Sequence, residues 1–270
     1  MTAISLPLLT LALTCLSALT RALPTEVVYD KRQALAQVVT TCSTPNTVAL
    51  TFDDGPMIYG QELVDLLDQN GIKGTFFYKP DLMLRLPLDG NNWRCIYDSD
   101  MMANVKYAYN HGHQVASHTW HHFDLTTLTW DQIHDEMWRV ELALTRIVGA
   151  YPAFMRPPYG NYNNLVRQAS AVRGQKVVIW DFDDGDSTGS TVAQSEADYS
   201  SLVRTHPNTC ISLNHETQAT TVRQVMPFAI QQLKAAGYNF ATVADCLGLP
   251  PYQSVGSPQT PDASWNCNDN

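Results

Sequence analysis

Short, strongly apolar runs alternate with amphipathic stretches along this chain, and this alternation limits its possible folds more than any other feature. We predict buried strands at residues 48–52, 74–78, 114–117, 153–156, 177–182, 210–214 and 239–243. We predict helices at residues 61–70, 100–110, 130–148, 164–173, 192–204 and 222–236. Strands that alternate with helices form a parallel sheet with the helices outside it. About 200 residues of this pattern suit a closed barrel, so we predict an α/β fold, a distorted (β/α)7 barrel in a single domain.

The composition and charge of the chain exclude several classes of protein. Its 270 residues are 44% hydrophobic and 16% charged, which is enough apolar material to bury one large core. The formal net charge is -9, and an acidic chain offers no basic surface to phosphate backbones or anionic lipids. We therefore expect no nucleic-acid partner and no membrane partner. The sequence leaves the oligomeric state open, with a monomer favoured.

The first residues differ in character from the rest. Residues 4–19 are uncharged and rich in leucine, and small residues precede a cleavage point after Ala22. This pattern predicts a signal peptide at residues 1–22 and hence a secreted, extracellular protein; the stretch is too short to span a bilayer well, although an uncleaved anchor remains the alternative. We expect an N-terminal segment at 23–41, one folded domain at 42–248 and an irregular C-terminal tail at 249–270.

Removal of the signal peptide would leave an odd number of cysteines: Cys42, Cys95, Cys210, Cys246 and Cys267. None of their spacings is typical of a zinc-thiolate site, so we expect disulfides and one free thiol. Cys42 precedes the first predicted strand and Cys246 follows the last, and these strands are neighbours in a closed barrel. We therefore predict a bridge between these two cysteines. Cys210 opens a buried strand and is predicted to be free, which leaves Cys95 and Cys267 for a second bridge.

Polar side chains stand where predicted strands end. Asp53 and Asp54 end the first strand, and the carboxyl ends of parallel barrel strands form the active-site rim. The same Asp-Gly-Pro sequence is also common in ordinary turns. His118 and His122 are four residues apart, so both imidazoles can face one divalent ion. Together with Asp54 they would make a three-ligand site that leaves a position open for water.

Three further polar stretches follow later strands, at residues 156–160, 181–186 and 213–216. Each has an ordinary structural explanation by itself: an ion-paired arginine, a solvated acidic loop and a core histidine. Because all three follow strands of one parallel sheet, we expect them at the same rim as the first two.

Five motifs resemble, in order, those of the polysaccharide deacetylases, carbohydrate esterase family four. They are TFDDGP at Thr51, HTWHH at His118, RPPYG at Arg156, DDGDS at Asp183 and LNH at Leu213. The resemblance runs from about Cys42 to Gly248 and is greatest to secreted fungal chitin deacetylases. It implies a polysaccharide deacetylase catalytic domain with a distorted, seven-stranded barrel. It also implies one divalent metal, usually zinc with cobalt possible, and hydrolysis of N-acetyl groups on polymers of N-acetylglucosamine.

The resemblance also implies a role for residues on the metal side of the site. Asp54, His118 and His122 resemble the metal ligands of the family. Asp53 resembles the general base that acts on the metal-bound water, and Arg156 resembles the partner of that base. A metal that activates water next to a carboxylate base is a coherent arrangement for hydrolysis.

A second group of residues is implied to act on the leaving amine and the acetyl group. His215 resembles the general acid, and Asp183 resembles the residue that orients it. The backbone N–H of Tyr159 resembles the donor that stabilises the oxyanion. The resemblance further implies that Tyr159 and Leu213 bind the substrate.

Two residues depart from the family pattern. His121 stands where Ser is common, which leaves the partner of His118 open between His121 and His122, and Ser187 stands where many members have Trp. The expected function is the metal-dependent deacetylation of chitin or chitooligosaccharides with release of acetate. The alternatives are a deacetylase of acetylxylan or peptidoglycan, or a secreted chitin binder without catalysis. The polar motif residues are all present, which favours an enzyme.

Overall fold

The computed structural model describes residues 34–83 and 93–268, so the predicted signal peptide lies outside the described part. The main sheet has nine strands, all paired in parallel, in the order β1-β9-β8-β6-β3-β2-β11-β10 with β12 against β2. The strands are β1 (Val38–Val39), β2 (Thr47–Gly55), β3 (Thr75–Tyr78), β6 (Gln114–Ser117), β8 (Phe154–Met155), β9 (Lys176–Val178), β10 (Phe182–Asp183), β11 (Thr209–His215) and β12 (Asn239–Phe240).

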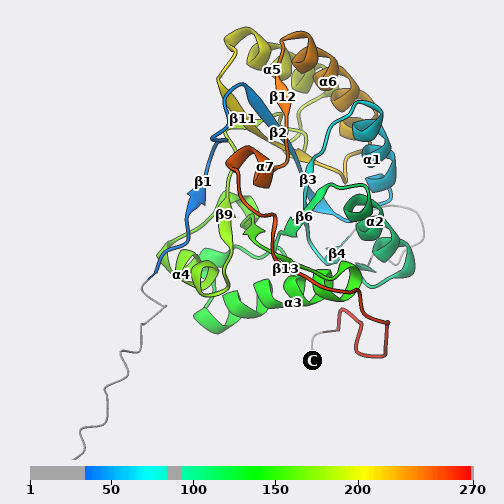
Figure 1. Cartoon of the computed structure of the whole chain (residues 1–270), viewed down its shortest axis with the longest axis vertical. Coiled ribbons are helices and arrows are strands. Elements are labelled where there is room, and N and C mark those ends of the chain that lie inside the picture. Colours follow the sequence, from blue (N-terminus) through cyan, green and yellow to red (C-terminus); the bar gives the residue numbers. More distant parts are fainter. Residues whose placement is uncertain (1–33, 84–92, 269–270) are drawn as a thin grey trace, which may run out of the picture. The chain divides into compact units, whose positions relative to one another are not determined.

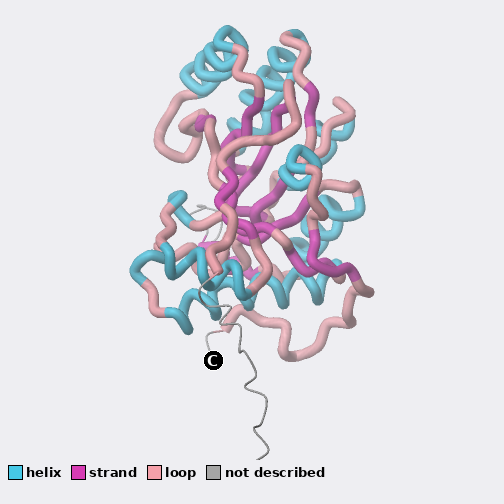
Figure 2. The backbone as a smooth tube through the Cα atoms, turned by 60° about the vertical axis from the view of Figure 1, so that its left-hand side comes forward, coloured by secondary structure: helices cyan, strands magenta, loops and turns pink. Residues whose placement is uncertain are grey.

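Helices lie outside these strands, as Figures 1 and 2 show. They are α1 (Gly60–Gln69), α2 (Ser99–Asn110), α3 (Trp130–Val148), α4 (Asn164–Val172), α5 (Val192–Thr205), α6 (Met226–Ala235) and α7 (Val243–Leu247), with a π-helical turn, η4 (Thr221–Val225), before α6. Shorter 3-10 turns form η2 (Leu125–Thr127) and η3 (Pro158–Gly160). Among the described residues, no helix combines the length and apolarity needed to cross a membrane.

The α/β fold and the single domain confirm the prediction, but the barrel is incomplete. Within the described residues β1 and β10, the two ends of the strand order, do not pair with each other. The predicted strand at 177–182 is in fact two strands: Ile179 N–H still bonds to Val39 at one end of the sheet, whereas Asp181 N–H bonds to Ile211 at the other. The chain therefore crosses the opening of the curled sheet at Trp180.

Helix α3 illustrates why the predicted elements form. Its N-terminus has a capping box between Thr129 and Gln132, which satisfies backbone N–H groups that the helix leaves unpaired. It ends at Gly149, whose φ of 75° is left-handed and suits glycine. A Cβ at this position would also lie 2.1 Å from the carbonyl oxygen of Gly256. The helix is therefore bounded by local sequence at both ends.

Two short antiparallel pairs were not predicted from the sequence. β4 (Asp81–Met83) pairs with β5 (Trp93–Cys95), and β7 (Ala150–Pro152) pairs with β13 (Tyr252–Val255). The prediction of an irregular tail is wrong for β13, because backbone pairing with β7 orders a segment whose own composition favours loops.

The cysteine predictions are confirmed. Cys42 and Cys246 form one disulfide, across 204 residues of sequence, and Cys95 and Cys267 form the other. Cys210 is a buried free thiol. The first bridge joins the segment before β2 to α7, which follows β12, and β2 and β12 are indeed paired. The second bridge holds the C-terminal tail against the end of β5.

Candidate active site

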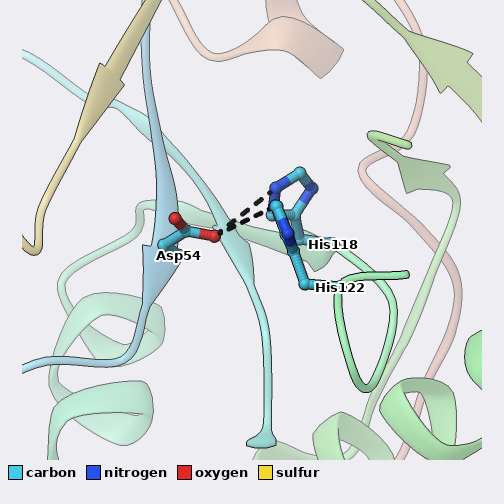
Figure 3. A group of neighbouring side chains, drawn as sticks. All are labelled: Asp54, His118 and His122. Atoms are coloured by element: carbon cyan, nitrogen blue, oxygen red, sulfur yellow. Dashed lines mark ion pairs between the residues drawn. The ribbon is translucent and has the colours of Figure 1, made fainter. Parts of the chain in front are cut away.

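A carboxylate and two imidazoles face one another at the carboxyl end of the sheet. Asp54 lies near the end of β2, His118 follows β6, and His122 lies in the next loop (Figure 3). Oδ1 of Asp54 is 3.6 Å from Nε2 of His118 and 3.5 Å from Nε2 of His122. One ligand atom from each residue lies within 4.8 Å of the other two. The structure thus brings together the three residues that the sequence predicts as metal ligands.

A local irregularity in β2 places Asp53 and Asp54 at the same site. Neighbouring residues of a regular strand point to opposite faces. Here Asp53 pairs with Phe77 and Gly55 with Tyr78, so Asp54 is an extra residue in β2, as in a β-bulge. Asp54 also has a left-handed φ of 68°. The bulge turns its carboxylate toward the imidazoles while Asp53 remains directed into the sheet.

The three side chains fit a divalent metal. Oδ1 of Asp54 is buried and has no hydrogen-bond partner among the described residues, which is costly for a carboxylate that binds nothing. Nδ1 of His118 lies 2.8 Å from the carbonyl oxygen of Arg156, so Nδ1–H donates there and Nε2 keeps its lone pair toward Asp54. Such a bond to the second ring nitrogen is typical of metal-binding histidines. Two imidazoles and one carboxylate suit zinc or cobalt.

The protonation states also suit metal binding. Burial raises the pKa of Asp54, but the charges of Lys79 and the facing histidines lower it to about 2. Burial lowers the pKa of His122, and the neighbouring His118 lowers it further, to about 3. At neutral pH the carboxylate is therefore ionised and the His122 ring is neutral, as metal ligands must be.

The structure favours His122 over His121 as the partner of His118. Nδ1 of His121 lies 2.5 Å from Oε1 of Glu136 on α3, and Oε2 of Glu136 accepts hydrogen bonds from the N–H groups of Trp120 and His121. His121 therefore serves to hold the ligand loop on α3. Sequence analysis did not find Glu136, whose only signal is a carboxylate among the apolar positions of a helix.

Asp53 is held by a buried arginine, as predicted for Arg156. Nη1 of Arg156 donates to Oδ1 of Asp53 and to Oγ1 of Thr51, both at 2.7 Å. The guanidinium lies 4.3 Å from the centre of the Phe77 ring, a favourable cation–π distance. The second oxygen of Asp53 remains directed at the metal triad, 3.6 Å from Nε2 of His118.

His215 lies on the other side of Asp53 and pairs with Asp186. Strand β11 places His215 opposite Asp53 of β2. Nδ1 of His215 is 2.7 Å from Oδ1 of Asp186, and the backbone N–H of His215 donates to Oδ2 of the same carboxylate. Burial lowers the pKa of His215, but the hydrogen bond and charge of Asp186 outweigh burial and raise it to about 9. The imidazole is thus protonated at neutral pH.

The prediction that Asp183 orients His215 is wrong. The exposed carboxylate of Asp183 accepts the backbone N–H of Gly185 at 2.8 Å and closes a local turn, as Asp often does in loops. That turn brings Asp186, three residues later, to His215. Asp186 is part of the same predicted acidic motif, but its spacing alone does not show which carboxylate reaches the histidine.

Tyr159 and Leu213 lie near these groups. The ring of Tyr159 is 65% exposed and lies 4.7 Å from that of His122. Its φ of 59° is left-handed, a conformation often kept at functional sites despite its cost. Leu213 is buried in β11, two residues before His215, and therefore on the same face of the strand.

Glu216 is a buried site residue that sequence analysis did not assign. Its Oε1 accepts the backbone N–H of Met57 at 2.7 Å, and a Cβ on Gly55 would lie 2.2 Å from the same oxygen. Burial raises the pKa of Glu216 to about 8. The side chain thus supports the turn that follows Asp54. Its position beside His215 in the sequence was the only available signal.

A curled parallel sheet with an Asp-His-His metal group and a separate protonated histidine is the arrangement of a metal-dependent hydrolase. Residues 40–178 match the family described as "Polysaccharide deacetylase". The chain belongs to this family.

Curated relatives are similar over most of this chain. A chitin deacetylase from Pestalotiopsis sp is 38% identical over 213 residues, which cover 78% of this chain and 67% of the relative. A chitin deacetylase from Colletotrichum lindemuthianum is 31% identical, with 78% and 83% covered. A probable peptidoglycan-N-acetylglucosamine deacetylase from Arthroderma benhamiae is 35% identical, but this chain spans only 47% of its length.

The fold is also similar to solved structures. The chitin deacetylase of Colletotrichum lindemuthianum superposes with a TM-score of 0.72 at 29% identity, over 81% of this chain and 94% of the other. A family 4 carbohydrate esterase from Streptomyces lividans, solved in complex with acetate, has a TM-score of 0.61 at 29% identity, over 74% and 92%. The chain therefore resembles these proteins in its fold as well as in its sequence.

Proposed function

We propose that this protein is a metal-dependent hydrolase that removes N-acetyl groups from chitin or chitooligosaccharides and releases acetate. The observation that carries the proposal is the placement of Asp53 between two unlike groups. On one side stands the Asp54 triad, with Nε2 of His118 3.6 Å from Oδ2 of Asp53, and on the other stands the protonated His215, in the strand register opposite Asp53. Amide hydrolysis needs both an activated water and a proton for the amine.

Asp54, His118 and His122 would hold one divalent ion, and this ligand set suits zinc. When bound, such an ion supplies a Lewis acid and lowers the pKa of water. Asp53 accepts the proton of the attacking water through its free Oδ2, because Arg156 occupies Oδ1 and fixes the orientation of the carboxylate. No other side chain is required for this first proton transfer.

His215 donates the second proton, to the nitrogen of the leaving sugar amine. Amines leave poorly as anions, so the acid must be protonated before the C–N bond breaks. Asp186 supplies both the charge that keeps His215 protonated and the hydrogen bond that directs Nε2 into the site. We assign the oxyanion donor to the backbone N–H of Tyr159, and contacts with the sugar to Tyr159 and Leu213.

The named relatives support the substrate class. Chitin deacetylases from two fungi cover two thirds or more of their own length in the match. The 35% identity to a probable peptidoglycan-N-acetylglucosamine deacetylase favours peptidoglycan as the second candidate. Both polymers carry the same acetamido group, and the candidates differ in the sugar that flanks it.

Acetate release from defined substrates tests the proposal. The zinc-loaded protein is expected to release acetate from chitohexaose faster than from peptidoglycan fragments or acetylxylan. Mass spectrometry should show a loss of 42 Da per acetyl group, roughly the mass of the C2H2O lost on hydrolysis. Release from peptidoglycan alone would transfer the assignment to the second candidate, and release from none would reject an enzymatic function.

We also propose that the protein is secreted and that residues 1–22 are its signal peptide. Two disulfides support an oxidising compartment. N-terminal sequencing of the protein from culture medium is expected to begin at Leu23. Retention of the uncleaved chain in the cell would contradict this proposal.

A further inference from the structure

The outer face of α3 carries two hollows that the catalytic site does not use. The first has a volume of about 660 Å³ and lies between α3 and the C-terminal tail; its walls include Tyr97, Trp120, Trp138 and Arg146. The second has a volume of about 510 Å³ and lies between α3 and the loop at residues 121–128. Asp135 and Arg139 line both hollows, so the two form one surface, which we call the α3 groove.

The α3 groove begins beside the metal triad. His121 and Phe123 line its second hollow and flank the predicted ligand His122 in the sequence. The ring of Phe123 is 52% exposed and stacks on that of His121 at 5.1 Å. From there the groove follows one side of α3, at residues 131, 135, 139, 142 and 146. A polymer bound at the triad could therefore continue along α3 without leaving the protein.

Planar rings are concentrated at the far end of the groove. Trp138 is 48% exposed and presents a large, planar, apolar ring to the groove. Arg139 lies 5.7 Å above the ring of the buried Trp120, and the half-buried Tyr97 and Trp265 pack at 5.4 Å, so these rings support the exposed ring of Trp138 from behind. Exposed aromatic faces beside hydrogen-bonding side chains bind the apolar faces and the hydroxyls of sugar rings.

The tail wall of the groove is fixed before any ligand arrives. The Cys95–Cys267 disulfide anchors the tail, and Nη2 of Arg146 donates to Oγ of Ser264 at 2.8 Å. Figure 1 shows the tail running beside α3. A wall held in place lowers the entropic cost of binding.

The charges of the groove do not favour an anionic ligand. Asp135 pairs with Arg139 at 2.9 Å, and Arg146 is engaged by Ser264 and the ring of Trp265. Asp131 and the buried Glu136 add negative charge to the same surface. A phosphorylated or sulfated polymer would gain no net attraction there. A neutral chain rich in hydroxyl and amide groups matches both the rings and the charges.

We infer that the α3 groove binds a second stretch of the polymeric substrate, an uncharged chain of N-acetylglucosamine units, while another stretch occupies the catalytic site. This inference rests on the proposed function for the identity of the polymer. Two contacts on one chain raise the apparent affinity because the second binding event is intramolecular. The groove would therefore act on long chains and have no effect on short ones.

Trp138→Ala tests the inference, with Trp138→Phe as the variant that keeps a ring and Val172→Ala as a control at an exposed apolar residue of α4 outside the groove. We expect Trp138→Ala to weaken binding to insoluble chitin about tenfold and to raise KM for long soluble chitin chains. KM for chitobiose and kcat for both substrates should stay within about twofold, and Trp138→Phe should retain most of the binding.

Several outcomes would overturn the inference. Equal binding of chitin by wild-type protein and Trp138→Ala would do so, as would an equal loss for chitobiose. Sedimentation that shows a dimer in the wild type and a monomer in Trp138→Ala, with unchanged chitin binding, would assign the groove to a second copy of the chain. The proposed function is judged separately, by acetate release from chitohexaose, which the wild-type catalytic site provides with or without the groove.

Discussion

His122 and His215 belong to one site, yet their environments shift their protonation in opposite directions. Burial lowers the pKa of His122 and the neighbouring His118 lowers it further, to about 3, although the carboxylate of Asp54, 3.5 Å away, acts in the opposite direction. His215 is more deeply buried, but Asp186 contacts its Nδ1 at 2.7 Å and its pKa is raised to about 9. One histidine is therefore available as a neutral ligand and the other as an acid.

His215 also differs from the other predicted ligand histidine, His118, in the group that its second ring nitrogen contacts. Nδ1–H of His118 donates to a neutral carbonyl oxygen, that of Arg156, whereas His215 faces the anionic Asp186. A carbonyl fixes the orientation of a ring without making it strongly basic; a carboxylate does both. Opposite pKa shifts in one site are a general sign of separate acid and ligand roles.

Removal of a ligand histidine should have the largest effect on the metal side. We expect His122→Ala to lose bound zinc and about 10³-fold in activity, because the Lewis acid and the activated water disappear together. His121→Ala is the matched neighbour and should keep the metal, since His121 faces Glu136. Zinc content by atomic absorption decides between them, and retention of zinc in His122→Ala with its loss in His121→Ala would reassign the ligand.

On the acid side, His215→Ala should keep zinc and lose about 10²-fold or more in kcat, because one proton transfer is removed. If the two histidines have separate roles, this variant must lose rate without losing metal. An ester substrate gives a further check, since an alkoxide leaves more easily than an amine and should be less affected. Loss of zinc from this variant would show that His215 and the ligands act as one group.

Asp186→Asn and Asp183→Asn test which of the two carboxylates supports His215. The first removes the charge that contacts His215 and should lower kcat roughly 10-fold to 100-fold. The second changes only the turn at Gly185 and should stay within about twofold. Steady-state rates on chitohexaose, with circular dichroism to confirm folding, measure both. A larger loss for Asp183→Asn would restore the role predicted from the sequence.

The smallest expected effect is a displacement of a pH profile. The pKa of His215 is raised from 6.5 to about 9, so its pairing stabilises the folded protein fully below pH 6.5 and the stabilisation is lost as the pH rises through about 9. In chelated protein the difference in unfolding free energy between wild type and Asp186→Asn should shrink over this window. The alkaline limb of kcat should lie at or below pH 9, because a bound cation disfavours the imidazolium. A difference that grows with pH would contradict the assignment.

Much of this site could be predicted because strand ends gather at one edge of a parallel sheet. That rule predicts from the sequence alone that Asp53, Asp54 and His215 lie together. It could not choose between Asp183 and Asp186, since the choice depends on an Asx turn that reverses the chain within three residues. The sequence also cannot choose between His121 and His122 as the metal ligand. The choice depends on the contact of His121 with Glu136, which only the structure shows.

The fold was predictable for similar reasons, and its errors have similar causes. Long amphipathic helices such as α3 carry their caps in the sequence. The predicted strand at 177–182 divides between two ends of the sheet, and Asp181, a residue type disfavoured in strands, was the only sign of this in a run that is otherwise suited to a strand. β13 was missed because its order comes from β7, about 100 residues earlier in the chain.

The backbone of the free Cys210 lies against one of the two disulfides, with its carbonyl oxygen 3.8 Å from Sγ of Cys42, whereas its side chain packs in a different core cluster. A thiolate that reached this disulfide would exchange with it and scramble the pairing. Burial raises the pKa of the Cys210 thiol, and the nearby Asp181 raises it further, so the attacking thiolate does not form at physiological pH. The protein can therefore keep the Cys42–Cys246 disulfide in an oxidising environment although it also carries an unpaired cysteine. The native pairing, once formed, is not exchanged by the Cys210 thiol.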